Sequence, residues 1–304
     1  KDQEEVSFKG DFHNMSETKF VQRLASVADL FVNDAFACAH RSSPSIVGFC
    51  NDLPCVAGEL MRYEIEKLNL ALNKPERPCI AVVGGIKVAD SISVADNMLR
   101  KGIADQIWAT GGVANLLIEL SGNDIGDINH SFLVKELGKE YHSTVETAKA
   151  LLNDFGELIN LPTDLAANVE DNRVDISVSQ LPIDAPLFDM GINSIMALSF
   201  AIKNAGTIIL NGPAGVFEVE DFALGTIEML NACAESDGYV VVGGGHTATL
   251  IMNRGLSDRM GHLSTGGGAC LDYMAGKVLP GIASLEISAD KFFMDVQKAS
   301  DKTN

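Results

Sequence analysis

The sequence predicts an α/β protein in which helices cover both faces of a doubly wound parallel sheet. Apolar, β-branched runs recur along the chain, and each is followed by glycines and a helix-like stretch: IAVV, TIIL and YVVV, with a fourth example in ADQIWATGGVANLLIEL. Continuous apolar strands are typical of a parallel sheet buried on both faces. Glycines at the carboxyl ends of such strands indicate a ligand crevice along one edge of the sheet.

The segment before these repeats has a different pattern. Apolar residues at helical spacing precede a strand-like LFVNDAF; they are Phe20, Val21, Leu24 and Val27. A long helix is predicted from Ala57 to Leu72, where Asn73–Lys74–Pro75 ends it. We interpret this helix as a hinge between an incomplete first domain and a complete second one, both Rossmann-like.

These patterns divide the chain into four expected segments. Residues 1–56 are the remainder of the first domain, 57–77 the interdomain helix and linker, 78–281 the second domain, and 282–304 a C-terminal tail. We expect the tail to fray at its end, QKASDKTN. The chain does not begin with Met, and we expect roughly 100 further residues upstream in the gene, in keeping with two domains of ordinary size.

Composition excludes several classes of protein. The formal net charge of -18 would repel a polyanion, so nucleic acid is not expected as a partner. No apolar run is long enough for a membrane span, and KDQEEVSFKG lacks the features of a signal peptide. The six cysteines contain no C-x-x-C pair, which indicates reduced thiols in a cytosol. Backbone N–H groups with one or two cations can still bind a small phosphorylated ligand.

A further glycine run, Ser264 to Ala269 (STGGGA), immediately precedes an apolar helix-like stretch. One glycine turn is weak evidence, because any αβ connection can use glycine for a positive φ. Several turns at equivalent sheet positions favour phosphate binding by bare N–H groups at helix starts. No turn reads G-x-x-x-x-G-K-[ST], so an ordinary P-loop kinase is not expected.

Five motifs resemble those of the phosphoglycerate kinase family, and they occur in the family's order. They are VNDAFACAHRSSPSIVGF (Val32 to Phe49), GGIKVADSI (Gly84 to Ile92), LNGPAGVFE (Leu210 to Glu218), GGGHTAT, and HLSTGGGACLDYMAGKVLPGI (His262 to Ile282). The resemblance extends from Asp29 to Ile282. The GGGH form of the fourth motif resembles archaeal members of the family.

The resemblance implies reversible phosphoryl transfer between ATP and 3-phosphoglycerate, giving ADP and 1,3-bisphosphoglycerate, in glycolysis and gluconeogenesis. It implies that the first domain binds phosphoglycerate, that the second binds the nucleotide, and that closure about the hinge excludes water. ATP or ADP and Mg²⁺ are the implied cofactors. A cytoplasmic monomer with small-molecule substrates, and with no nucleic-acid or membrane partner, is expected.

The matching residues make up a predicted site. Lys87 is expected beside the transferred phosphoryl group, although a lysine without this motif would more often be an ordinary solvated one. His40 and Arg41 are expected at the phosphoglycerate, where an arginine fork suits phosphate or carboxylate. The predicted catalytic turn is Gly266, Gly267 and Gly268. The predicted nucleotide-binding residues are Gly84, Gly85, Gly111, Gly112, Gly191, Asn211, Pro213, Glu218, Gly243, Gly244, Gly245, His246 and Thr247.

By the resemblance, Glu218 accepts hydrogen bonds from the ribose hydroxyls, and Gly111 and Gly112 let adenine lie against the backbone. Gly191 is expected to act in the same way as these two glycines. Asn211 is equally compatible with a turn-forming role alone.

The chain departs from the family pattern in three places. Ser91 stands where the family has a second lysine, and His246 where it has an aspartate associated with the magnesium nucleotide. Imidazole is a poor magnesium ligand, so we expect His246 to contact phosphate and not the metal. The metal ligands are left unassigned. Asp90 is the remaining acid near Lys87 in sequence. Nothing from Lys1 to Ala28 matches the family's upstream basic patch.

Two alternatives follow from these departures and from the fold class. A non-catalytic nucleotide-binding relative is compatible with Ser91 and His246, and only a turnover assay separates it from a kinase. A dehydrogenase should show G-x-G-x-x-G after its first strand and an acid about 20 residues further on, an arrangement that the sequence lacks.

Overall fold

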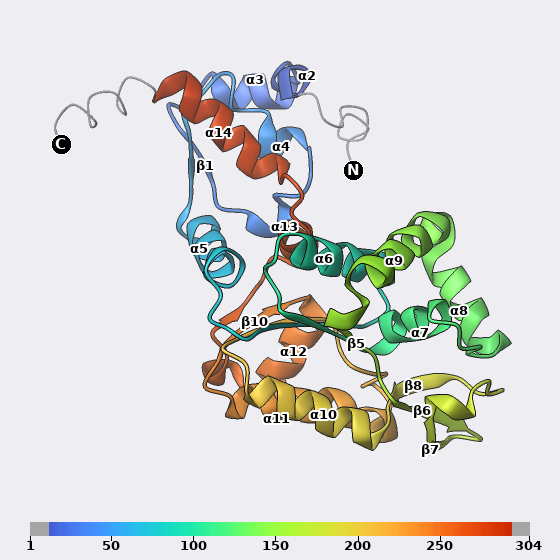
Figure 1. The fold of residues 1–304 in the computed structure, drawn as a ribbon. Helices are drawn as coiled ribbons and strands as arrows, with labels where there is room; N and C mark the ends of the chain where they lie inside the picture. Colours follow the sequence, from blue (N-terminus) through green and yellow to red (C-terminus); the bar gives the residue numbers. More distant parts are fainter. Residues whose placement is uncertain (1–11, 294–304) are drawn as a thin grey trace. The chain divides into compact units, whose positions relative to one another are not determined.

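The structure is a computed structural model that describes residues 12–293. The chain forms two compact units (Figure 1). Unit 1 combines Lys1–Lys67 with Thr265–Asn304, and unit 2 is Leu68–Ser264. The helix α5 (Glu59–Asn73), close to the predicted hinge helix, begins in unit 1 and ends in unit 2. No helix within residues 12–293 is long and apolar enough to cross a membrane.

Unit 2 is built on a parallel sheet of six strands in the order β11-β10-β9-β3-β4-β5. The strands are β3 (Cys79–Val83), β4 (Gln106–Ala109), β5 (Ile159–Asn160), β9 (Thr207–Asn211), β10 (Tyr239–Gly243) and β11 (His262–Leu263). Every residue of β3 and β9 is buried, as expected of continuous apolar runs in the middle of a parallel sheet. The predicted α/β fold with parallel sheets is confirmed.

Helices cover both faces of this sheet (Figure 1). The helices of unit 2 are α6 (Val88–Arg100), α7 (Gly111–Leu120), α8 (Asp127–Leu137), α9 (Tyr141–Phe155), α10 (Ile192–Lys203), α11 (Leu224–Glu235) and α12 (Gly245–Asn253). Figure 1 shows α6 and α9 on one face and α10, α11 and α12 on the other. On the second face, Leu198, Met229 and Ile251 of these three helices share a core with Val82 and Leu210 of the sheet.

Short 3-10 helices connect these elements. They are η2 (Gly138–Glu140), η3 (Gly156–Leu158), η4 (Val178–Gln180), η5 (Glu220–Phe222) and η6 (Ser257–Arg259).

Unit 2 also contains an antiparallel sheet, order β7-β6-β8, that the sequence analysis does not include. Its strands are β6 (Asp164–Val169), β7 (Asn172–Ser177) and β8 (Leu187–Met190). Glu170 and Asp171, with φ of 51° and 62°, form the two-residue turn between β6 and β7. Such turns favour Asn-Gly or Asp-Gly, so the Glu-Asp pair provides little signal for a hairpin.

Unit 1 is made of shorter elements. They are α2 (Phe12–Ser16), α3 (Lys19–Ala25), β1 (Phe31–Asn33), η1 (Phe36–Cys38), α4 (Pro44–Val47), β2 (Cys55–Ala57), α13 (Gly268–Met274) and α14 (Pro280–Phe292). β1 and β2 form a parallel pair. Of the four apolar residues predicted to line one helix face near α3, only Val21 is buried, where it packs with Phe49 and Leu53.

The predicted C-terminal tail differs from the structure, because residues 280–292 form α14. Ser288 Oγ accepts a hydrogen bond from Cys55 N at 2.8 Å and donates to Leu53 O at 3.3 Å. Gly281 N donates to Ala39 O at 2.8 Å. These bonds tie α14 to unit 1, and the units divide before Thr265 and not at the expected 281/282 boundary. The stretch QKASDKTN lies outside the described residues.

Candidate functional site

The glycine turns after three neighbouring strands of unit 2 pack against one another. β9, β3 and β4 are adjacent and parallel, so their carboxyl ends meet at one edge of the sheet. Gly84 N donates to Asn211 O at 2.8 Å, and Gly112 N donates to Gly85 O at 3.2 Å. A Cβ added at Gly84 would lie 2.6 Å from Pro213 O. Five predicted nucleotide-binding residues are thus together at the point where the strand order reverses, which is where α/β sheets bind ligands.

Thr110 lies among these turns, although the sequence analysis does not single it out. Its side chain is fully buried, and its Oγ1 has no hydrogen-bond partner within residues 12–293. A Cβ at Gly84 would lie 2.1 Å from that oxygen. Gly111, the next residue, has a φ of +52°, and its added Cβ would lie 3.0 Å from Gly85 N. Both space and backbone conformation therefore require glycines here.

The turn after β10 leads directly into a helix and leaves open space beside the helix's first residue. Gly243 ends β10, Gly244 has a φ of +95°, and Gly245 begins α12. A Cβ added at Gly245 would meet nothing within 4 Å. Thr247, in the first turn, is buried, and its Oγ1 has no partner in the described part of the chain. The side chain of His246 is outside that part. Unpaired N–H groups and the helix dipole make this start suitable for an anion.

Lys87 occupies the N-cap position of α6, directly after the glycine turn of β3. It is exposed, and its ammonium makes no hydrogen bond or ion pair with residues 12–293. Ser91, where the family has a lysine, is buried instead: its Oγ donates to Gly84 O at 3.2 Å and accepts from Asn211 Nδ2 at 3.1 Å. The amide of Asn211 thus helps to hold two turns together, and Lys87 remains free to meet an anion.

Glu218 belongs to the loop that connects β9 to α11. Thr226 Oγ1 accepts hydrogen bonds from Ala214 N at 3.0 Å and Gly215 N at 3.2 Å, which fixes the start of this loop. Val216 N donates to Phe188 O of β8 at 2.8 Å. Glu218 itself is exposed, and its carboxylate makes no hydrogen bond or ion pair with residues 12–293. The loop therefore presents an unpaired acceptor, as a ribose-binding role would need.

The structure offers a reason for Gly191 that involves no ligand, because the Asp164 carboxylate occupies the space beside it. A Cβ at Gly191 would lie 2.4 Å from the Asp164 carboxyl carbon. That carboxylate accepts hydrogen bonds from Asn193 N at 2.9 Å and Ser194 N at 2.8 Å, so it caps the start of α10. Burial acts to raise the pKa of Asp164, but the bonds from Ser194 and Asn193 outweigh it and lower the pKa.

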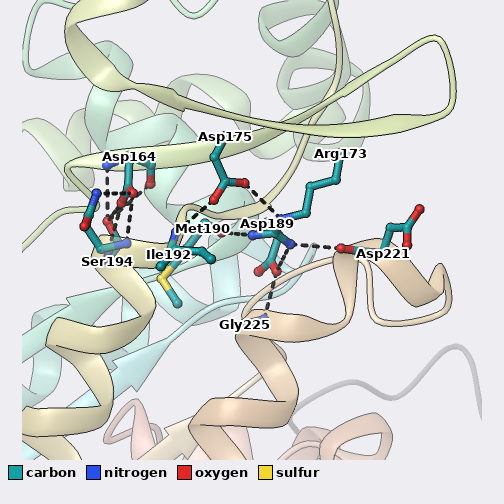
Figure 2. Close-up of polar contacts among 10 residues, drawn as sticks. Asp164, Arg173, Asp175, Asp189, Met190, Ile192, Ser194, Asp221 and Gly225 are labelled. Atoms are coloured by element: carbon teal, nitrogen blue, oxygen red, sulfur yellow. Dashed lines mark hydrogen bonds and ion pairs between the residues drawn. The ribbon is translucent and has the colours of Figure 1, made fainter.

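A second buried acid, Asp189 of β8, lies beside the loop of residues 212–223 that connects β9 to α11, called the nucleotide loop below because Glu218 is predicted to bind the nucleotide (Figure 2). Burial raises its pKa, while hydrogen bonds from Arg173 and Gly225 act in the opposite direction. Its Oδ1 has no hydrogen-bond partner in the described residues. A Cβ at Gly215 would lie 2.5 Å from that oxygen. The acid therefore fills the space behind the loop.

Unit 1 brings its predicted site residues together. A Cβ at Gly266 would lie 2.4 Å from the Phe36 ring, and one at Gly268 would lie 3.3 Å from His40 Nε2. Arg41, the next residue, is exposed, and its guanidinium has no partner within residues 12–293. Gly267 has a φ of +50°, and its added Cβ would meet nothing within 4 Å. His40, one of the two predicted phosphoglycerate ligands, thus lies beside the predicted catalytic turn.

The same turn is held by a buried acid that the sequence analysis missed. Glu64 of α5 is 1% exposed, and its Oε1 accepts hydrogen bonds from Thr265 N at 2.8 Å and Thr265 Oγ1 at 2.7 Å. The two residues are 201 positions apart, so no local pattern could have indicated this contact.

Comparison with known proteins decides the family. The family model for phosphoglycerate kinase matches residues 3–277. The chain belongs to the phosphoglycerate kinase family. It is 44% identical to the phosphoglycerate kinase of Methanobacterium bryantii over 276 residues, which cover 91% of this chain and 66% of that protein. Over 299 residues it is 41% identical to the enzyme of Methanothermus fervidus, covering 98% and 70% of the two chains.

A solved structure of phosphoglycerate kinase from Pyrococcus horikoshii superposes with a TM-score of 0.85 at 38% identity, covering 95% of this chain and 71% of that one. The predicted family and its archaeal character are confirmed. The chain spans about two thirds of the length of the curated relatives it matches, from 66% to 70% for the two named above.

Proposed function

We propose that this chain supplies the nucleotide-binding part, and a portion of the phosphoglycerate-binding part, of a phosphoglycerate kinase. The reaction is reversible phosphoryl transfer from ATP to the carboxylate of 3-phosphoglycerate, giving ADP and 1,3-bisphosphoglycerate. Family membership supports this, and the observation that carries it is the position of Lys87. An ammonium without a partner in the described residues follows the β3 turn at the edge where three glycine turns converge.

In this proposal the nucleotide lies along the carboxyl edge of the unit 2 sheet. The open space before Gly245 receives phosphate oxygens, which accept hydrogen bonds from the first N–H groups of α12. Adenine lies against Gly111 and Gly112, and the unpaired carboxylate of Glu218 accepts hydrogen bonds from the ribose. His246 and Thr247 are assigned to the phosphates.

The acceptor substrate is assigned to unit 1. The planar guanidinium of Arg41 has no partner within residues 12–293, and it suits bidentate contact with the phosphate or carboxylate of 3-phosphoglycerate. His40 lies against Gly268 and would line the same surface. The backbone N–H groups from Gly266 to Gly268 are assigned to the phosphoryl group in transfer, whose charge spreads over its equatorial oxygens. Closure about α5 would bring both ligands together and exclude water.

Residues 12–293 contain no cluster of side chains that would by itself hold a magnesium ion. No group of three or more His, Cys, Asp or Glu side chains within residues 12–293 has an arrangement that could hold a metal. By the resemblance, His246 stands where the family has an aspartate in this turn. Mg²⁺ commonly binds through substrate phosphates with few protein ligands. We therefore assign it to the nucleotide phosphates, and the role of Lys87 does not depend on it.

The proposal predicts a large and selective effect at Lys87. In the natural gene product, Lys87→Ala should lower kcat about a hundredfold to a thousandfold, or about 3–4 kcal/mol, with a smaller change in KM for ATP. The migrating phosphoryl group has more concentrated charge in the transition state than in bound ATP, so the lost cation matters most there. Lys87→Arg should restore activity only in part, because a planar fork does not occupy the place of a compact ammonium.

Lys101→Ala is the matched control, because Lys101 is an exposed lysine at the other end of α6. Coupled steady-state assays and melting curves on the same samples make the comparison. A Lys87→Ala enzyme that keeps more than about a third of normal kcat would contradict the assignment, since loss of a preorganised charge costs far more.

A non-catalytic nucleotide-binding protein is the second candidate, and Ser91 favours it. The position of the family's second lysine holds a buried hydroxyl bound to Gly84 O, so this chain has one cation fewer at the edge. ADP binding by a natural gene product without detectable turnover would select this candidate. A cytoplasmic monomer remains a prediction.

A further inference from the structure

The side chain of Arg173 connects three parts of unit 2 behind the nucleotide loop (Figure 2). Arg173 is on β7, and only 15% of its side chain is exposed. Its Nη1 donates to Asp189 Oδ2 at 2.9 Å, and its Nε donates to Asp175 Oδ1 at 2.9 Å. Its Nη2 donates to Met190 O at 2.7 Å. The fork therefore ties the β6–β7 hairpin to β8.

The same guanidinium reaches the far end of the nucleotide loop. Nη1 of Arg173 also donates to Asp221 O at 3.0 Å, and the guanidinium lies 6.0 Å from the centre of the Phe222 ring. Both contacts are in η5, three and four residues after Glu218. Asp189 Oδ2, which receives Arg173, also accepts a hydrogen bond from Gly225 N at 2.8 Å, at the start of α11.

The loop is thus held in place both before and after Glu218, and Glu218 lies between these two fixed points. Before Glu218, Val216 N donates to Phe188 O at 2.8 Å. After it, the ring of Phe222 packs edge-on against Phe188, with ring centres 5.2 Å apart, and Arg173 binds the preceding carbonyl group. Glu218 has no partner of its own in the described residues, so these neighbours decide where its carboxylate lies.

We propose that Arg173, held by Asp189, is a positioning residue for nucleotide binding that acts through Glu218. It touches no substrate in this proposal. Instead it fixes the backbone after Glu218, so that the carboxylate is preorganised to accept hydrogen bonds from a ribose. The inference rests on the proposed nucleotide site and adds to it a supporting residue.

The arrangement requires an arginine and not merely a positive charge. Four acceptors from three segments, β7, β8 and η5, surround one planar group, and each receives an N–H from it: two carboxylates and two backbone carbonyls. A lysine ammonium has three donors at one point and cannot span these positions. Arg173→Lys should therefore keep the charge opposite Asp189 and lose the contact with Asp221 O.

The test measures ADP binding by calorimetry in the wild-type chain, Arg173→Lys, Arg173→Met, Glu218→Ala and the double variant with Arg173→Lys and Glu218→Ala. Arg173→Lys should raise the Kd for ADP about tenfold, the size expected when a charged hydrogen bond is lost. In the Glu218→Ala background the same substitution should change Kd less than about twofold, because the two residues act in series. Arg100→Lys is the control, since Arg100 is an exposed arginine that also binds two aspartates.

Kinetics on the natural gene product provide a second readout. Arg173→Lys should raise KM for ATP about tenfold and lower kcat less than about threefold, whereas a general loss of folding would lower kcat with the folded fraction. Circular dichroism shows which variants fold; if Arg173→Met does not, Arg173→Lys decides the question.

An unchanged Kd in Arg173→Lys, or a tenfold effect that persists without Glu218, overturns the positioning role and leaves the nucleotide site intact. A folded wild-type chain that binds no ADP overturns both.

Discussion

The two units hold their glycine turns in different ways. In unit 2, backbone meets backbone between neighbouring strands, as in the bonds from Gly84 N to Asn211 O and from Gly112 N to Gly85 O. In unit 1, the turn before α13 is held by side chains, with Glu64 bound to Thr265. The edge in unit 2 is therefore held by the backbone of the sheet, and the side chains of Ser91 and Asn211 add further bonds. The turn in unit 1 depends on residues brought from the other end of the chain.

The strongest test of this difference is Gly84→Ala in unit 2. The new Cβ would lie 2.6 Å from a backbone oxygen and 2.1 Å from Thr110 Oγ1, so neighbouring turns would have to move apart. We expect a loss of unfolding free energy of about 3 kcal/mol, measured by urea denaturation. Gly156→Ala is the control, because its Cβ meets nothing within 4 Å and its backbone is helical; it should be neutral or stabilising by up to about 1 kcal/mol. Equal stability of the two variants would show that the turns are not locked by packing.

A smaller effect should appear in unit 1 at Ser288 of α14. Ser288→Ala leaves the buried N–H of Cys55 without its acceptor, which should cost about 1–2 kcal/mol. Ser284→Ala on the same helix removes only a local bond to Gly281 O, so its cost should be smaller. Denaturation curves for both variants decide whether unit 1 depends on contacts distant in sequence. A Ser288→Ala protein as stable as wild type would show that the contact of α14 with Cys55 does not stabilise unit 1.

Much of unit 2 could be predicted from sequence because its signals are local. The apolar runs at β3, β9 and β10 lead directly into glycine turns, and each turn is next to its own strand. Lys87 and Glu218 were found only through family motifs, since an exposed charged residue has no distinguishing local pattern. That neither side chain has a hydrogen-bond or ion-pair partner within residues 12–293 became visible only in the structure.

The residues that support the site were not predictable in this way. Thr226 binds the loop 11 and 12 residues before it, and Arg173 reaches an aspartate 16 positions away. The local sequence around Thr226 is that of an ordinary helix, and the sequence around Arg173 is that of an ordinary hairpin. Neither pattern therefore indicates these two contacts. Ser91 shows the opposite case: the sequence indicated a missing cation, and the structure shows a hydroxyl that joins two turns. Contacts of this kind join residues that are distant in sequence and close only in the folded chain. The pattern of neighbouring residues in one sequence does not indicate them.

The central claim is that the open edge of unit 2 binds the nucleotide, and ADP calorimetry on the wild-type chain and on Gly245→Ala tests it most directly. A Cβ at Gly245 meets nothing within 4 Å, so the variant should melt at the same temperature as wild type or slightly higher. It would nevertheless occupy the space in front of the first N–H groups of α12, where we place phosphate. We expect the wild-type chain to bind ADP and the variant to bind it at least about tenfold more weakly, a difference of about 1.4 kcal/mol. Equal affinity in the two proteins, or no binding by folded wild-type chain, would contradict the account.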